Sequence, residues 1–98
     1  MKGGLRVTGG IYRGRRVTCP PGIIRPAMDR MRESVFGVLG NLSGDSFLDL
    51  FSGSGIVGIE AASRGAGEIT LVEKDRRKIG ILKANIELIE AKTHIASM

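Results

Sequence analysis

The chain has 98 residues and a single cysteine, so it is long enough for one small domain and cannot form an intrachain disulfide. Its net charge of +5 is uneven, because residues 1–32 hold eight basic residues against one acidic residue, whereas residues 33–98 hold seven against nine. The sequence has no Cys/His cluster with metal-ligand spacing, no apolar segment at the N-terminus, and no apolar run approaching the roughly 18 residues of a membrane span, which favours a cytoplasmic protein with a polyanionic partner, nucleic acid first.

The first segment, residues 1–24, is basic and contains short β-prone pieces separated by glycines. This pattern predicts a small hairpin or meander with arginines on its exposed face, ended by Pro20-Pro21, because consecutive prolines cannot join a sheet ladder. Such an arm fits contact with RNA. A basic strand face that is merely solvated is the alternative.

The rest of the chain alternates helical and strand patterns. A helix is predicted from near Pro26, with one apolar stripe at helical spacing. The stripe consists of Met28, Met31, Val35, Val38, Leu39 and Leu42. A strand over 47–51, a helix over 55–63, a strand over 69–72 and a helix capped by Asp75 follow. This order predicts an α/β fold, the first half of a doubly wound sheet.

The run from Phe47 to Gly58 is the most informative part of the sequence, because an apolar strand meets a helix through glycines. Such a turn offers free backbone N–H groups and room for a nucleotide-like ligand. The G-x-G-x-x-G spacing also fits a dinucleotide. However, Asp49 lies inside the strand, where it would repel a pyrophosphate and would suit the ammonium group of S-adenosylmethionine. Glu73, at the end of the next strand, is placed for a ribose diol in either case.

Four consecutive segments, 6–16, 25–36, 49–66 and 71–75, resemble the RsmD-type methyltransferases in order, and the likeness runs from about Leu5 to Leu88. This family uses S-adenosylmethionine to methylate the N2 amino group of a guanine in small-subunit (16S) ribosomal RNA. The resemblance implies the first half of a class I methyltransferase fold, Rossmann-like, over residues 25–90, with an N-terminal β-hairpin arm over residues 1–24.

The resemblance also implies site residues. Asp49 and the loop would hold the methionine end of the cofactor, Glu73 the ribose hydroxyls and Lys74 the adenine edge, while Arg25 to Asp29 would close over it. The loop residues are Phe51, Ser52, Gly53, Ser54 and Gly55. Ala27 replaces the threonine common in the family. The residues expected to contact RNA are Arg6, Tyr12, Arg13, Arg15 and Arg16, with Tyr12 either stacking on a base or packing against the hairpin's own helix.

One departure from the family concerns catalysis. Its Asp-Pro-Pro-aromatic motif, which would position the guanine amino group, is absent from the 98 residues, so no catalytic residue is expected here and the chain alone is expected to be inactive. Residues 91–98, including His94, are interpreted as a tail outside the family pattern. Two alternatives stay open: a non-catalytic RNA-binding fragment and a nucleotide-dependent oxidoreductase half-domain. The open sheet edge also predicts a homodimer.

Overall fold

The computed structural model describes residues 5–18, 26–50 and 52–97, with the backbone alone for residues 26–28. The N-terminal arm contributes two short strands, which pair antiparallel with Leu5 opposite Val17. The remaining elements alternate between helices and strands, as the sequence predicts. In chain order the elements are β1 (Leu5–Arg6), β2 (Arg16–Val17), α1 (Pro26–Leu39), β3 (Ser46–Asp49), α2 (Ile56–Ser63), β4 (Glu68–Glu73), α3 (Arg76–Ile86) and β5 (Lys92–Ser97).

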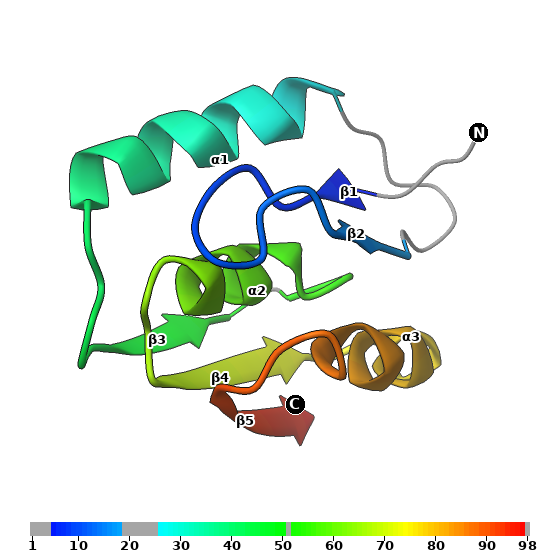
Figure 1. Cartoon of the computed structure of the whole chain (residues 1–98). Coiled ribbons are helices and arrows are strands. Elements are labelled where there is room, and N and C mark those ends of the chain that lie inside the picture. Colours follow the sequence, from blue (N-terminus) through cyan, green and yellow to red (C-terminus); the bar gives the residue numbers. More distant parts are fainter. Residues whose placement is uncertain (1–4, 19–25, 51, 98) are drawn as a thin grey trace.

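The main sheet has three parallel strands in the order β3-β4-β5. Figure 1 shows α2 and α3 on the same side of this sheet, with the hairpin and α1 stacked beyond them. Parallel neighbours joined by crossover helices are the hallmark of a doubly wound α/β sheet, so the predicted first half of a Rossmann-like fold is confirmed. The carboxyl ends of β3 and β4 lie at one edge, where such folds bind their ligands.

The prediction of a tail at residues 91–98 is wrong, because Lys92–Ser97 forms β5 and pairs with β4 along its whole length. Thr93 and Ile95 are half-buried and alternate with exposed Lys92 and His94. This alternation has the period of two that is typical of a strand. The signal is weak in the sequence because the segment is short and most of its residues are polar. His94 pairs with Glu68 on the sheet surface, with 2.7 Å between Nε2 and Oε2.

The apolar stripe of α1 does not face the core. Phe36 is buried and Arg32 lies beside it on the packed face, whereas Met31, Val35 and Val38 are exposed, Val38 to 87%. The periodicity therefore identified the helix but not its buried side. Met31 and Val35 each precede by one residue the pair that packs toward α2, Arg32 and Phe36. Most of the stripe is therefore turned toward solvent.

The core lies between the sheet, α2 and the arm. Ile69 and Leu71 of β4 are fully buried beneath Ile59 of α2, and arm residues Val7 and Val17 belong to the same cluster. The arm is thus an integral layer of the domain. Among the described helices, none has the length and apolar character needed to cross a membrane.

Candidate functional site

The glycine loop joins the carboxyl end of β3 to the amino end of α2 and is a closely bonded turn. The N–H of Ser52 donates to Val72 O of β4 at 3.1 Å, and the N–H of Gly55 donates to Ser52 O at 2.7 Å. The hydroxyl of Ser52 donates to Asp49 O at 3.1 Å. The described part of the loop is therefore tied to both neighbouring strands.

Two glycines are required by geometry. Gly55 has φ +86°, a left-handed conformation in which a side chain is strained. Gly58 lies where α2 crosses β4, and a Cβ there would come within 2.4 Å of Leu71 Cδ2. The last glycine of the G-x-G-x-x-G pattern thus allows the helix to pack closely on the strand, whichever ligand the loop takes.

Glu73 lies directly beside the glycine loop. It is only 7% exposed, and its carboxylate accepts from Gly53 N–H at 2.7 Å through Oε1 and from Asp75 N–H at 2.9 Å through Oε2. A carboxylate offers about four acceptor positions. Glu73 therefore supports the loop and keeps acceptor capacity for a further donor, such as a sugar hydroxyl.

The other predicted cofactor residues are distributed around this point. Asp49 is half-buried on the face of the sheet that carries Leu71. Ser54 is buried, its hydroxyl accepting from Ile56 N–H at 3.2 Å, while Lys74 is exposed just beyond Glu73. These residues meet at the carboxyl ends of β3 and β4.

Two predicted residues, Arg25 and Phe51, lie outside the described residues. Asp29 is described, on the first turn of α1. Its carboxylate pairs with Arg32 Nη2 at 2.7 Å, and its side chain is 31% exposed. In this structure the carboxylate of Asp29 is therefore engaged in an ion pair within α1.

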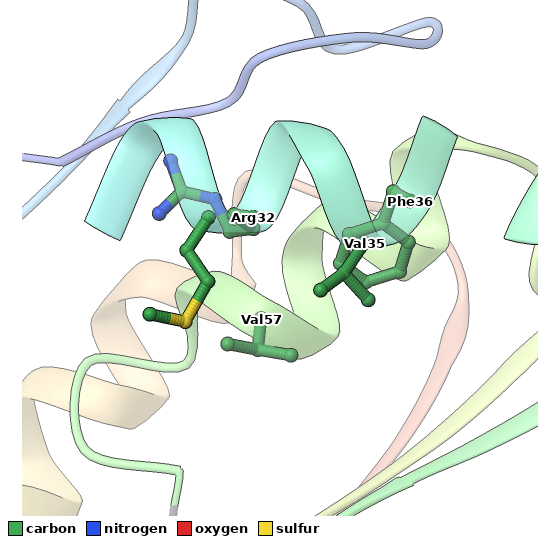
Figure 2. Close-up of a pocket in the computed structure, with 5 residues that line it drawn as sticks. Arg32, Val35, Phe36 and Val57 are labelled. Carbon is green, nitrogen blue, oxygen red and sulfur yellow. The ribbon is translucent and has the colours of Figure 1, made fainter. Parts of the chain in front are cut away.

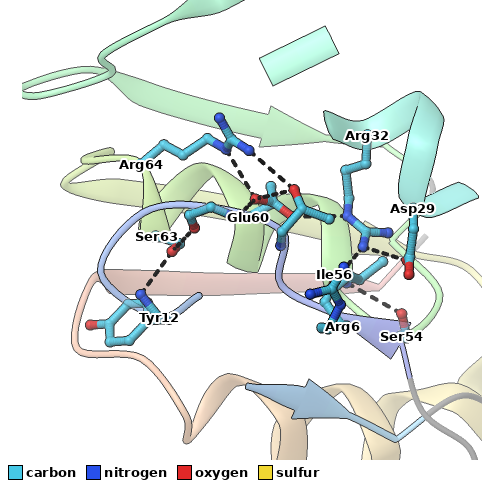
Figure 3. A network of polar contacts seen from close by, with 11 residues as sticks. Arg6, Tyr12, Asp29, Arg32, Ser54, Ile56, Glu60, Ser63 and Arg64 are labelled. Carbon is cyan, nitrogen blue, oxygen red and sulfur yellow. Dashed lines mark hydrogen bonds and ion pairs between the residues drawn. The ribbon is translucent and has the colours of Figure 1, made fainter. Parts of the chain in front are cut away.

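A buried cluster around Glu60 was not predicted from the sequence. Glu60 of α2 is fully buried, and from the described residues its carboxylate accepts five hydrogen bonds, at 2.9 to 3.0 Å. The donors are Thr8 N–H, Thr8 Oγ1, Gly9 N–H, Arg32 Nε and Arg64 Nε. Figure 3 shows Arg32 and Arg64 reaching Glu60 from opposite sides. The cluster joins α1, α2 and the arm.

The ionisation of Glu60 follows from these contacts. Burial opposes the charged form, but the hydrogen bonds from Thr8, Arg32 and Arg64 outweigh it and hold the pKa of Glu60 below its usual range. Arg32 also donates to Arg6 O in the arm. The only sequence signal for this cluster is an acid inside the apolar run of α2, four residues before an arginine.

The arm is fixed to α2 and to the segment after α3. Ser63 accepts from Tyr12 N–H at 2.9 Å through Oγ and from Ile11 N–H at 2.9 Å through its carbonyl. Tyr12 is 9% exposed, and its hydroxyl accepts from Glu90 N–H at 2.9 Å. The Arg15 guanidinium lies 4.7 Å from the centre of its ring. Tyr12 is therefore bonded to the rest of the domain, through α2 and the segment after α3.

The exposed face of the arm carries arginines. Arg6 of β1 lies directly opposite Arg16 of β2, and both side chains are exposed, as is that of Arg13. Arg15 is exposed too, although its Nη1 donates to Leu88 O at 2.6 Å. Like charges opposite one another destabilise a hairpin unless an anion lies between them. The pair of Arg6 and Arg16 is thus a candidate anion contact.

An apolar cavity of about 130 Å³ lies between α1 and α2. It is lined by Met31, Arg32, Val35, Phe36 and Val57. Figure 2 shows the guanidinium of Arg32 pointing away from Val57, so the cavity presents carbon rather than charge. Its lining offers no group for acid–base or nucleophilic chemistry.

Comparison with known proteins agrees with this geometry. A family model described as "Conserved hypothetical protein 95" matches residues 5–98. Ribosomal RNA small subunit methyltransferase D of Escherichia coli strain K12 is 42% identical over 92 residues, covering 91% of this chain and 46% of that protein. The Bacillus subtilis protein YlbH is 38% identical over 92 residues, covering 92% of this chain and 50% of its own length.

The solved structure of yhhF from Escherichia coli superposes with a TM-score of 0.85 at 35% identity, covering 96% of this chain and 52% of that one. The strand–glycine loop–helix unit, the acid ending the next strand and the parallel sheet agree with this superposition and give the class: a methyltransferase fold of the Rossmann-like type. Within that class, the chain belongs to the RsmD-type family and corresponds to its N-terminal region.

Two earlier expectations change with these matches. The family model extends to residue 98, so the idea that residues 91–98 fall outside the family pattern is wrong. The family also rules out the oxidoreductase alternative. The chain spans about half the length of the curated relatives that it matches.

Proposed function

We propose that this chain holds S-adenosylmethionine at the glycine loop and small-subunit ribosomal RNA at the arm, as the cofactor-binding half of a guanine-N2 methyltransferase. The observation that carries the cofactor part is the contact of Glu73 with Gly53 N–H, which places a buried carboxylate at the carboxyl ends of β3 and β4. The cofactor, when bound, supplies the sulfonium methyl group.

The donor set fits this cofactor. Asp49 is an acid near the loop, suited to the ammonium of the methionine moiety, and Glu73 retains acceptor capacity for the ribose diol. Ser52, Gly53, Ser54 and Gly55 supply the close backbone between them. Lys74 would lie at the adenine edge, and the segment Arg25 to Asp29 would close over the cofactor. Asp29 would then have to exchange part of its pairing with Arg32.

Titration calorimetry with S-adenosylhomocysteine and, separately, NADH tests the cofactor assignment. We expect binding of the first alone, weakened about tenfold or more in Glu73→Gln, because a charge-assisted contact contributes roughly 1.5–3 kcal/mol. Glu68→Gln, the same change at the opposite end of β4, is the control and should leave affinity unchanged. Equal binding by Glu73→Gln would refute the ribose role.

The RNA part rests on the exposed arginines of the arm, Arg6, Arg13, Arg15 and Arg16. Contacts to phosphate need cationic forks but no fixed base, and each contributes about 0.7–0.9 to the log–log dependence of affinity on salt. Removing Arg6 and Arg16 together should flatten that slope by roughly 1.5. Lys92→Ala, an exposed cation on β5, is the control. An unchanged slope in the double variant would mean that the arm face is only solvated.

The positioning of the guanine that accepts the methyl group requires residues other than those that hold the cofactor. The 98 residues contain no Asp-Pro-Pro-aromatic sequence to orient a guanine amino group. Methyl transfer requires the donor carbon and the amino nitrogen to be held in line. The purified 98-residue chain should therefore bind cofactor and RNA without transferring labelled methyl to ribosomal RNA. The alternative of a purely RNA-binding fragment requires that no cofactor bind at all.

A further inference from the structure

Asn85 of α3 bonds to both the arm and the glycine loop. It is 4% exposed, and its Oδ1 accepts from Thr18 N–H at 2.9 Å. Its Nδ2 donates to Thr18 O at 2.9 Å and to Ser54 O at 2.8 Å. The amide can be oriented in only one way here, because the N–H of Thr18 needs an acceptor and the two carbonyls need a donor.

The other described attachments of the arm end elsewhere. Glu60 and Ser63 hold residues 8–12 to the middle and end of α2, as Figure 3 shows. Tyr12 and Arg15 bond to the backbone of residues 88–90. Within the described part of the chain, the bonds of Asn85 alone run from the arm to residues 52–55.

Thr18 follows directly after β2, whose Arg16 faces solvent opposite Arg6. Because two of the three bonds of Asn85 go to the backbone of Thr18, a shift of that backbone changes the direction of the third bond. That bond satisfies Ser54 O in the same turn that presents Gly53 N–H to Glu73. Ser54 is itself buried, so losing the bond would leave a costly unpaired carbonyl.

We propose that Asn85 is a positioning residue that couples the arm to the glycine loop, so that RNA bound on the arm and cofactor bound at the loop strengthen one another. This inference rests on the proposed function, since it needs both ligands. Coupling of this kind is reciprocal: the factor by which RNA tightens cofactor binding equals the factor by which cofactor tightens RNA binding.

Asn85→Asp is the sharpest variant. It keeps an acceptor for Thr18 N–H but replaces the donor with a carboxylate oxygen that faces Thr18 O and Ser54 O. Ser63→Ala is the matched control, because it removes the side-chain bonds to Tyr12 N–H and Gly9 O without touching the loop.

The experiment uses the isotope-labelled 98-residue chain, an RNA hairpin from the small subunit and S-adenosylhomocysteine. In the wild type, RNA should shift the amide resonances of the arm and also those of Gly53 to Gly55, and it should tighten S-adenosylhomocysteine binding about fivefold or more. In Asn85→Asp the loop shifts should disappear and the factor should fall to about one, while Ser63→Ala keeps both.

The outcomes separate the two ideas. Arm amides that do not respond to RNA would overturn the proposed RNA contact and the coupling with it. If RNA shifts the arm amides of the wild type but not those of Gly53 to Gly55, the coupling alone is overturned. This outcome is measured on the wild type, so it does not depend on whether a variant folds. A coupling factor preserved in Asn85→Asp, or lost equally in Ser63→Ala, would also refute a specific role for Asn85.

Discussion

At the scale of single residues, the carboxylate of Glu60 is the most consequential group outside the loop. It is shared by Arg32 and Arg64, whose side chains are 3% and 17% exposed. Removing one member of a buried ion pair typically costs 3–5 kcal/mol, because the remaining charge stays buried. We expect Glu60→Ala to lower the free energy of unfolding by about that amount, measured by urea denaturation. Glu33→Ala, an exposed acid on α1, should leave the midpoint unchanged.

The pH dependence of stability provides a second test of Glu60. Its folded-state pKa lies below the ordinary value of 4.5, which applies to the unfolded chain. The ionised cluster therefore contributes its full stabilisation above about pH 4.5, and this is lost as pH falls through the folded-state pKa. Glu60→Gln should flatten the fall in Tm below pH 4.5. A parallel profile in the variant would show that other acids govern acid unfolding.

At the scale of elements, the crossing of α2 over β4 depends on Gly58. A Cβ at this position would lie 2.4 Å from Leu71 Cδ2, and Leu71 is fully buried. Overpacking of this kind costs about 1–3 kcal/mol, so Gly58→Ala should destabilise the domain by that much in urea. Gly80→Ala, at an exposed position of α3, has nothing within 4 Å of its new Cβ and should be neutral or stabilising. Two variants of equal stability would contradict the close approach.

How much of this could be predicted from the sequence differs between elements. The glycine loop, Asp49 and Glu73 were predictable, because glycine spacing and strand-end acids are local signals, and Asp75 indeed caps α3 by accepting from Arg77 N–H. Non-local features were not: β5 has too weak an alternation, and α1 packs through Arg32 and Phe36 instead of its apolar stripe. Apart from the pair of Glu60 with Arg64, the side-chain bonds of Asn85 and Glu60 reach partners 28 to 67 residues away, which no local pattern encodes.

At the scale of the whole molecule, β3 pairs with β4 on one side and with no other described strand on its second side. Leu48 and Leu50, in and just after this strand, are more than half exposed. An open, apolar strand edge is a template for pairing between chains. We expect light scattering to show concentration-dependent self-association, reduced in Leu48→Lys. Met31→Lys, on the exposed stripe of α1, tests in the same measurement whether that helix contributes to self-association. A stable monomer at all concentrations would contradict this prediction.

The attachment of the arm also constrains the order in which the chain folds. Thr8 bonds to Glu60 and Tyr12 to the backbone of Glu90, separations of 52 and 78 residues. Contacts so distant in sequence close only after the intervening chain has formed, so residues 8–12 dock after Glu60 and Glu90 have been made. Until Leu88 and Glu90 have emerged, Arg15 and Tyr12 of the arm lack their native backbone partners. During that interval the nascent chain presents its most cationic segment to the ribosome, whose RNA is polyanionic.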